Sequence, residues 1–267
     1  MNAFRTLLVA AAFVLATLAP GLAQRAGIPP PFPAAGPIIA RFHQDPRVER
    51  LDGYLQGLVN SPKDWSDYPV LVGFFAASFR RHPDWIEKLL PAQFDAKTGD
   101  AIAAALRLAG QNSITPALRV RLATPGHDDK LNSELAGLPS RLEDVPLATA
   151  THLDIVWGAF FATGDMGYVR RILDVFAHVA NGSDAVALDV TRLTVAMGGG
   201  SKDGLEQIKA RHDRATLRMI VHASTAEWAL IANAQNFPAV KQLLESYVAQ
   251  QPDKPAAKSL SAFLKQL

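Results

Sequence analysis

Apolar residues recur with the period of an α-helix along most of the chain after residue 46. The clearest stripe follows the i, i+3, i+4, i+7, i+11 spacing of one buried helix face. Its members are Val169, Ile172, Leu173, Phe176 and Ala180, with Arg170, Arg171 and Asp174 on the other side. A second stripe consists of Val240, Leu243, Leu244 and Tyr247. This pattern predicts amphipathic helices that pack against one another.

Residues that start and stop helices lie at the ends of these stripes. Ser183 precedes a helix that Gly198 ends, and Thr115 stands before Pro116 in the arrangement of a helix N-terminus. In residues 118–122 the apolar positions alternate as in a strand. Since no partner strand is evident, we predict a helix there and an all-α protein.

The chain also repeats itself after a shift of 71 residues, which brings Trp157 onto Trp228 and Val169 onto Val240. Each copy consists of an apolar, alanine-rich helix, a short turn and an amphipathic helix. A degenerate third copy covers residues 71–90, and a weaker pair lies midway between the first two, in residues 184–208. Helix pairs at such spacing predict stacked units that bury their faces against their neighbours.

Over roughly residues 150–250 the chain resembles tetratricopeptide-type helical repeats. The resemblance rests on Trp157 and Phe160-Phe161 in a first helix, Gly164-Asp165 in a turn, and Val169 with Leu173 in a second helix. It departs from that family at Val169, where a small residue is usual, and in its irregular spacing. It implies antiparallel helix pairs stacked as a short irregular α-solenoid. The alternative is an irregular helical bundle.

The N-terminus has the layout of a secretory signal peptide over residues 1–23. A start with Arg5 precedes an apolar run at 7–18, and the small residues Gly21 and Ala23 follow. We expect cleavage after Ala23, or alternatively after Gln24, and a periplasmic or secreted protein. An uncleaved inner-membrane anchor through residues 7–19 is the alternative, but a span needs about 20 apolar residues.

Prolines divide the rest of the chain. Five of them fall within residues 25–38, which predicts an extended linker over 24–45. Residues 46–267 then form an all-helical domain, with a possible sub-boundary near 125–147.

Composition excludes several classes of protein. The 267 residues include no cysteine, which removes disulfides, cysteine-bound metal centres and thiol catalysis. A formal net charge of +2 argues against a nucleic-acid partner. The later segment that is richest in apolar residues, 217–234, contains charged side chains and does not predict a membrane span.

Candidate chemistry is sparse. The seven histidines include no pair with the spacing of a helical metal site, and no cofactor motif is present, so we expect neither metal nor cofactor. His127 and Asp128 form the densest polar cluster, which also fits a helix-capping loop. An enzyme site assembled from His127, Asp128 and the distant His152 remains one hypothesis.

The preferred hypothesis is a non-catalytic scaffold that binds an envelope protein or peptide. Three polar residues of the apolar segment 217–234, His222, Glu227 and Asn233, are its candidate binding surface. If this helix is instead buried, the same polar groups form internal hydrogen bonds. A deep pocket that gathers His127, Asp128 and His152 would favour the enzyme. A long open groove with scattered polar residues would favour the scaffold.

Overall fold

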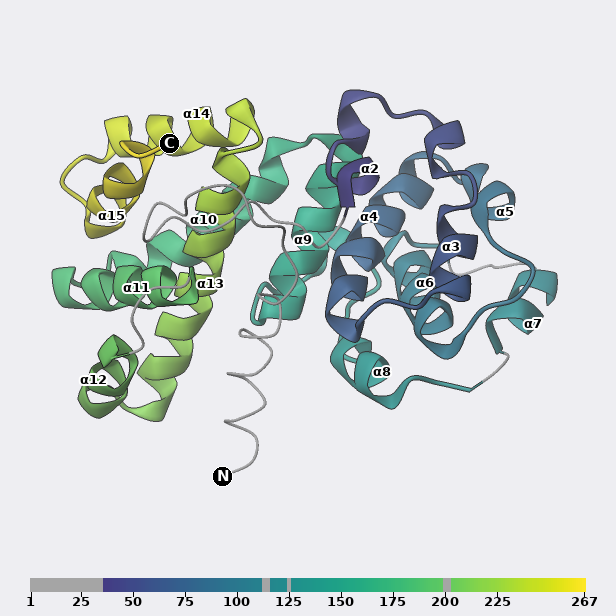
Figure 1. The fold of residues 1–267 in the computed structure, drawn as a ribbon, viewed down its shortest axis with the longest axis horizontal. Coiled ribbons are helices and arrows are strands. Elements are labelled where there is room, and N and C mark those ends of the chain that lie inside the picture. The colour runs from purple at the N-terminus through teal and green to yellow at the C-terminus, as the bar shows by residue number, and fades with distance from the viewer. Residues whose placement is uncertain (1–35, 112–115, 124–125, 199–202) are drawn as a thin grey trace. The chain divides into compact units, whose positions relative to one another are not determined.

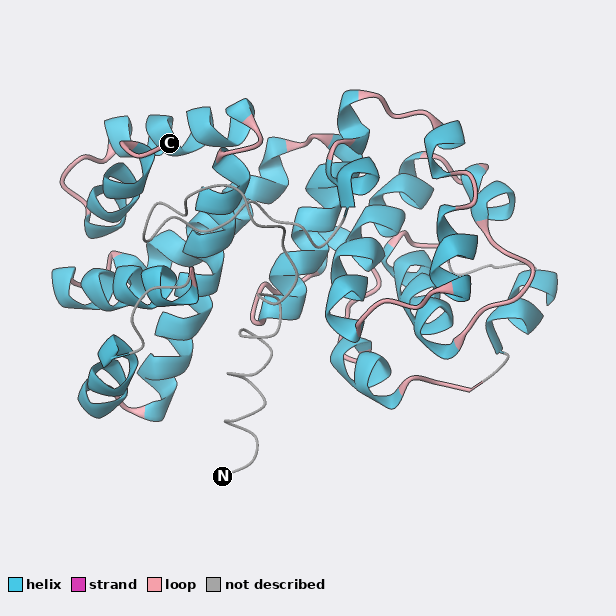
Figure 2. Cartoon of the chain, viewed as in Figure 1, coloured by secondary structure: helices cyan, strands magenta, loops and turns pink. Residues whose placement is uncertain are grey.

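The computed structural model describes residues 36–111, 116–123, 126–198 and 203–267. Helices are the regular secondary structure of these ranges, with loops between them and no strand (Figure 2). The all-α prediction is therefore confirmed. The expected signal peptide, its cleavage positions Ala23 and Gln24, the alternative anchor at 7–19 and the capping residue Thr115 lie outside the described residues.

The chain divides into two compact units between Tyr168 and Val169. The expected sub-boundary, near 125–147, lies inside the first of them. We call residues 33–168 the N-terminal unit and residues 169–267 the C-terminal unit (purple to teal and green to yellow in Figure 1).

The N-terminal unit is built from short helices around two longer ones. Its α-helices are α2 (Gly36–Ala40), α3 (Tyr54–Asn60), α4 (Tyr68–Arg81), α5 (Trp85–Leu89), α6 (Ala96–Leu108), α7 (Pro116–Ala123), α8 (Asp129–Leu135) and α9 (Ala150–Thr163). Its 3-10 helices are η1 (Phe42–Gln44), η2 (Val48–Leu51), η3 (Trp65–Asp67) and η4 (Leu142–Asp144).

Helices α4 and α9 form the centre of the N-terminal unit, where they make its most extensive helix contact. Two glycines allow their backbones to touch. A Cβ atom on Gly158 would lie 1.9 Å from the carbonyl oxygen of Val70, and one on Gly73 would lie 1.7 Å from that of Ile155. The two main helices of this unit are thus remote in sequence.

The folded chain begins earlier than the proline pattern predicted. The structure has α2 and η1 within residues 36–44, where we expected an extended linker. Ile39 and Phe42 are 0% and 1% exposed, and Phe42 meets the ring of Phe74 edge-on at 5.2 Å. The linker prediction is therefore wrong from Gly36 onward, because burial of these two side chains outweighs the flexibility suggested by the prolines.

The C-terminal unit consists mainly of helices that follow the predicted stripes. They are α10 (Met166–Ala180), which begins three residues before the division, α11 (Asp184–Met197), α12 (Asp203–Arg211), α13 (Arg214–Ala234), α14 (Pro238–Gln250) and α15 (Pro255–Leu264). Helix α13 packs against α11, α14 and α15. Its apolar middle is consequently enclosed within the C-terminal unit.

Several local predictions agree with the structure. Ser183 caps α11 by accepting a hydrogen bond from the Val186 amide at 3.2 Å, and Gly198 follows the last turn of that helix. Residues 118–122 are helical, with Leu118 buried and Val120 68% exposed. At α9 the cap is Thr149, which accepts from the His152 amide at 3.2 Å, whereas Thr151 is buried and donates to Glu134 at 2.9 Å.

Candidate functional site

The three residues predicted as a binding surface all lie on α13. Glu227 and Asn233 are 0% and 1% exposed, and the Asn233 amide donates to the carbonyl of Ala229 at 2.9 Å. These two side chains therefore follow the internal hydrogen-bonding alternative and form no surface in this structure. His222, which precedes both of them on α13, is partly buried.

Glu227 lies at the centre of a network of hydroxyl groups. It receives a hydrogen bond from Thr194 of α11 at 2.7 Å and a short one from Ser259 of α15. Ser259 also contacts Thr191 at 2.6 Å. Burial raises the pKa of the Glu227 carboxyl to about 7, and the two hydroxyls offset only part of that shift. Glu227 thus joins three helices, and its carboxyl is about half protonated at pH 7.

His127, Asp128 and His152 have separate local roles. The Nδ1 of His127 lies 2.7 Å from Asp100 of α6, and Asp128 caps α8 by accepting from the Leu131 amide at 2.9 Å. His152 accepts a hydrogen bond from the Ala148 amide at 3.2 Å, before α9. None of the three lines either of the two cavities described below. Neither of these two cavities therefore brings the three residues together.

The pair of His127 and Asp100 has one feature of a catalytic dyad. Asp100 is 9% exposed and also accepts from the Asp128 amide at 2.8 Å, so its carboxylate is held in place. The hydrogen bond to Asp100 raises the pKa of the exposed His127 imidazole. A buried carboxylate that orients a histidine is the arrangement of acid–base dyads, but an adjacent nucleophile and a cavity are also required.

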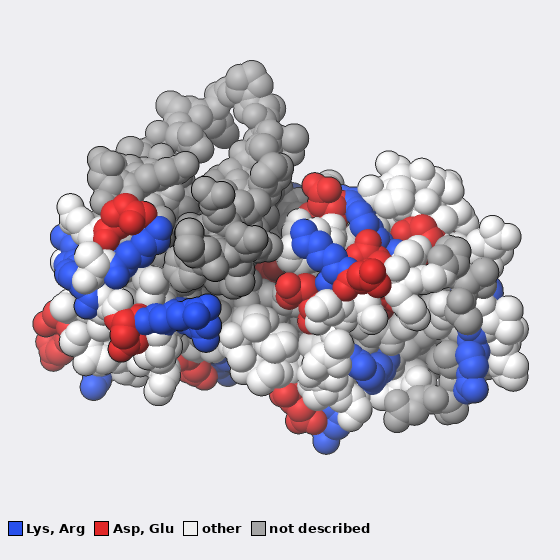
Figure 3. All heavy atoms as spheres, turned by 90° about the horizontal axis from the view of Figure 1, so that it is seen from below, with Lys and Arg blue, Asp and Glu red and all other residues white. Residues whose placement is uncertain are grey.

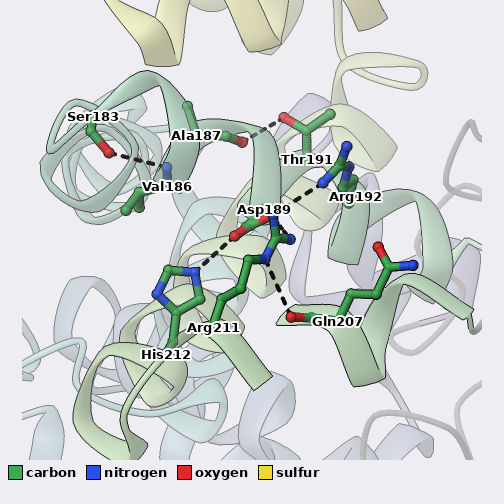
Figure 4. A network of polar contacts seen from close by, with 9 residues as sticks. All are labelled: Ser183, Val186, Ala187, Asp189, Thr191, Arg192, Gln207, Arg211 and His212. Carbon is green, nitrogen blue, oxygen red and sulfur yellow. Dashed lines mark hydrogen bonds and ion pairs between the residues drawn. The ribbon is translucent and has the colours of Figure 1, made fainter. Parts of the chain in front are cut away.

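A second buried carboxylate, Asp189 of α11, holds the end of α12 (Figure 4). Arg211 donates to it at 2.6 Å and His212 Nε2 lies 2.8 Å from its other oxygen. Arg192 lies 3.6 Å away on the same helix. Because both carboxylate oxygens are engaged from neighbouring elements, we interpret this network as an internal clamp of the C-terminal unit.

Asp154 of α9 is a titratable residue that the sequence analysis did not single out. Its position near the start of α9 is also one where an acidic side chain is favourable for the helix dipole. In the structure, burial raises its pKa to about 7, and the nearby charge of Asp67 adds to this effect. The feature of the sequence that could have revealed it is an acidic residue in an otherwise apolar helix. Neither Asp154 nor Asp67 lines one of the two cavities described below, so we assign these residues no catalytic role.

The C-terminal unit has an open hollow of about 510 Å³ between the end of α10 and the end of α14. It is lined by Asp174, Ala177, His178, Asn181, Gly182, Tyr247 and Gln251. Polar side chains are scattered along it, and small residues stand between them. We call it the α10–α14 hollow.

Asn181 fixes the geometry of the α10–α14 hollow. Its amide nitrogen donates to the Tyr247 hydroxyl at 3.1 Å, and its amide oxygen accepts from the Ala256 backbone at 3.1 Å. Tyr247 is the acceptor in the first bond, so its own hydroxyl proton is available to an incoming carbonyl group. His178 and Gln251 are exposed and add further donors and acceptors.

Comparison with known protein families, with curated proteins and with solved structures gives no match. Over the described residues, no helix combines the length and apolar character of a membrane span. The same residues include no group of three metal-ligating side chains. On the face drawn in Figure 3, positive and negative residues are intermixed and neither sign forms a broad patch. The function is therefore inferred from the geometry of the site.

Proposed function

We propose that this is an exported helical-repeat protein, similar in design to tetratricopeptide repeats, that binds an extended segment of an envelope protein in the α10–α14 hollow. The observation that supports it is the shape and lining of that hollow, which is open and bordered by hydrogen-bonding side chains. Helices α10 and α14 are the two copies of the amphipathic helix in the 71-residue repeat. A groove between repeated helices suits a peptide better than a small substrate.

The chemistry of the lining fits a peptide backbone. Tyr247 and Gln251 offer donors to carbonyl groups, while Asp174 offers an acceptor to amide groups. Asn181 is already held by two protein hydrogen bonds, so the main polar wall is preorganised and less conformational entropy is lost on binding. Fold alone constrains function weakly, so the proposal rests on this site.

The test is a crosslinking experiment in the cell with the full chain tagged at its C-terminus. We expect one near-stoichiometric envelope partner, identified by mass. The variant His178→Ala with Gln251→Ala is expected to weaken partner binding about thirtyfold, and so to reduce recovery, since two lost hydrogen bonds at about 1 kcal/mol each contribute about 2 kcal/mol. Val120→Ala, a change at an exposed residue of α7, is the control and should retain the partner. Recovery of the protein alone, or equal recovery from both variants, contradicts the proposal.

Export has its own measurement, the intact mass of the protein recovered from cells. We expect the loss of residues 1–23, or of residues 1–24 if cleavage follows Gln24. A mass that retains residues 7–19 in a membrane fraction would instead support the anchor. This result is independent of partner binding.

The alternative hypothesis, a periplasmic enzyme, is supported by the pair of His127 and Asp100 alone. The contacts of Asp128 and His152 are local, as described above. A loss of a hydrolytic activity in His127→Ala, with unchanged stability, would favour this alternative over the scaffold.

A further inference from the structure

The N-terminal unit contains a second, smaller cavity of about 40 Å³. It lies at the C-terminal end of α4, next to the start of α5, the chain around η1 and the end of α9. A cavity needs about 10–15 Å³ to hold one water molecule. This one has room for a small organic molecule as well as for water.

One side of the cavity is aromatic. Phe42 and Trp85 are 1% and 8% exposed, and their rings meet edge-on with centroids 6.0 Å apart. The imidazole of His82 stacks on Trp85 at 4.1 Å. Ala77 and Ala162 complete an apolar wall that suits a short hydrocarbon group.

Ser78 supplies a buried hydroxyl group to the same cavity. The residue is 4% exposed, and its Oγ has no hydrogen-bond partner among the described residues. The other hydroxyl in the lining, that of Thr163, donates to the Ala159 carbonyl at 2.7 Å and accepts from the Asp165 amide at 3.1 Å. Buried polar groups are normally paired, so the Ser78 hydroxyl is the position at which a ligand atom would be bound.

The charges around the cavity favour an anion. Of the residues that line it, Arg81 carries a positive charge, and none is an aspartate or glutamate. The neighbouring Arg80 forms an ion pair with Glu143, whereas Arg81 has no carboxylate partner in the described part of the chain. Arg81 is exposed, which places a cation at the edge of the cavity.

We propose that this cavity binds a short-chain monocarboxylate. The carboxylate accepts hydrogen bonds from the Ser78 hydroxyl and the Arg81 guanidinium, and the alkyl chain packs against Phe42 and Trp85. Charge-assisted hydrogen bonds to arginine supply the preference for a carboxylate over a neutral group. The small volume limits the chain to a few carbon atoms. This site lies in the N-terminal unit and does not depend on the α10–α14 hollow.

Isothermal titration of the purified protein with sodium butyrate tests the proposal. We expect saturable binding of one butyrate per chain, and no saturable binding of butyramide, which has the same shape without the charge. Hexanoate is expected to bind no better than butyrate because the cavity is small. Absence of saturable butyrate binding means that the cavity holds water only, and overturns the proposal.

Two variants locate the site. Ser78→Ala should weaken butyrate binding about fivefold, and Arg81→Gln about tenfold or more. Arg80→Gln is the matched control and should leave the affinity unchanged. Ser78→Ala should also fold normally without butyrate, as a melting temperature equal to or above that of the wild type will show, because its hydroxyl has no protein partner among the described residues. Binding that is unchanged in both site variants overturns the proposal.

Discussion

Replacing Gly158 with alanine is expected to lower the free energy of unfolding by about 3 kcal/mol or more, the upper part of the range for overpacked cores. The new Cβ would lie 1.9 Å from the Val70 carbonyl oxygen and 2.7 Å from the Phe74 backbone nitrogen. Both atoms belong to the backbone of α4, so no side chain can turn aside. Helices α4 and α9 must move apart, and their buried contacts loosen along the whole interface. Urea denaturation followed by circular dichroism measures the loss.

Gly57→Ala is the matched control for this substitution. Gly57 lies within α3, and a Cβ atom added there would meet no atom within 4 Å. Alanine there should be neutral or stabilise the protein by about 0.5–1 kcal/mol, because alanine favours the helix more than glycine does. A wild-type stability for Gly158→Ala would mean that α4 and α9 do not cross at Gly73 and Gly158.

Glu227 is expected to make the stability fall as the pH rises towards neutrality. Its carboxyl has a pKa of about 7 in the folded protein, against an ordinary value of 4.5. The stabilising contribution is therefore complete below about pH 4.5 and is lost as the pH rises through about 7. The difference corresponds to about 3 kcal/mol. The physical cause is burial, because the ionised form would be held among hydroxyl groups with no cation in contact among the described residues.

The measurement is the free energy of unfolding from pH 4.5 to 8 for wild type and Glu227→Gln. Glutamine keeps the shape but has no proton to lose, so the variant should lack this part of the pH dependence. Glu245→Gln, at an exposed position of α14, should behave as the wild type. The raised pKa of Asp154 acts in the same direction, so the comparison between variants isolates Glu227. Parallel pH profiles for wild type and Glu227→Gln would contradict the account.

Periodicity predicted the helices well because each buried face leaves a local signature. The stripe at Val169 and Leu173 became α10, and Ser183 and Gly198 marked the two ends of α11. Periodicity shows which face is buried and not what covers it. The approach of α9 to α4 through Gly158 and Gly73 joins segments that no local pattern connects.

The polar residues of α13 show the same limit at the level of the site. Glu227 has partners 33 and 32 residues away, Thr194 and Ser259. The sequence alone therefore could not decide whether the Glu227 side chain lies on the surface or in the interior. The α10–α14 hollow was missed for a related reason. Tyr247 belongs to the second apolar stripe, and Asn181 is 66 positions away in the sequence and belongs to no predicted feature. Only folding brings their side chains to 3.1 Å.

The most direct test of the proposed function is site-specific photo-crosslinking in the cell. Gln251, at the edge of the α10–α14 hollow, and Val120, exposed on α7, are each replaced in turn by p-benzoylphenylalanine. The account predicts a single crosslinked envelope partner from position 251 and none from position 120. A partner that crosslinks equally from both positions, or from neither, would contradict the α10–α14 hollow as the binding site.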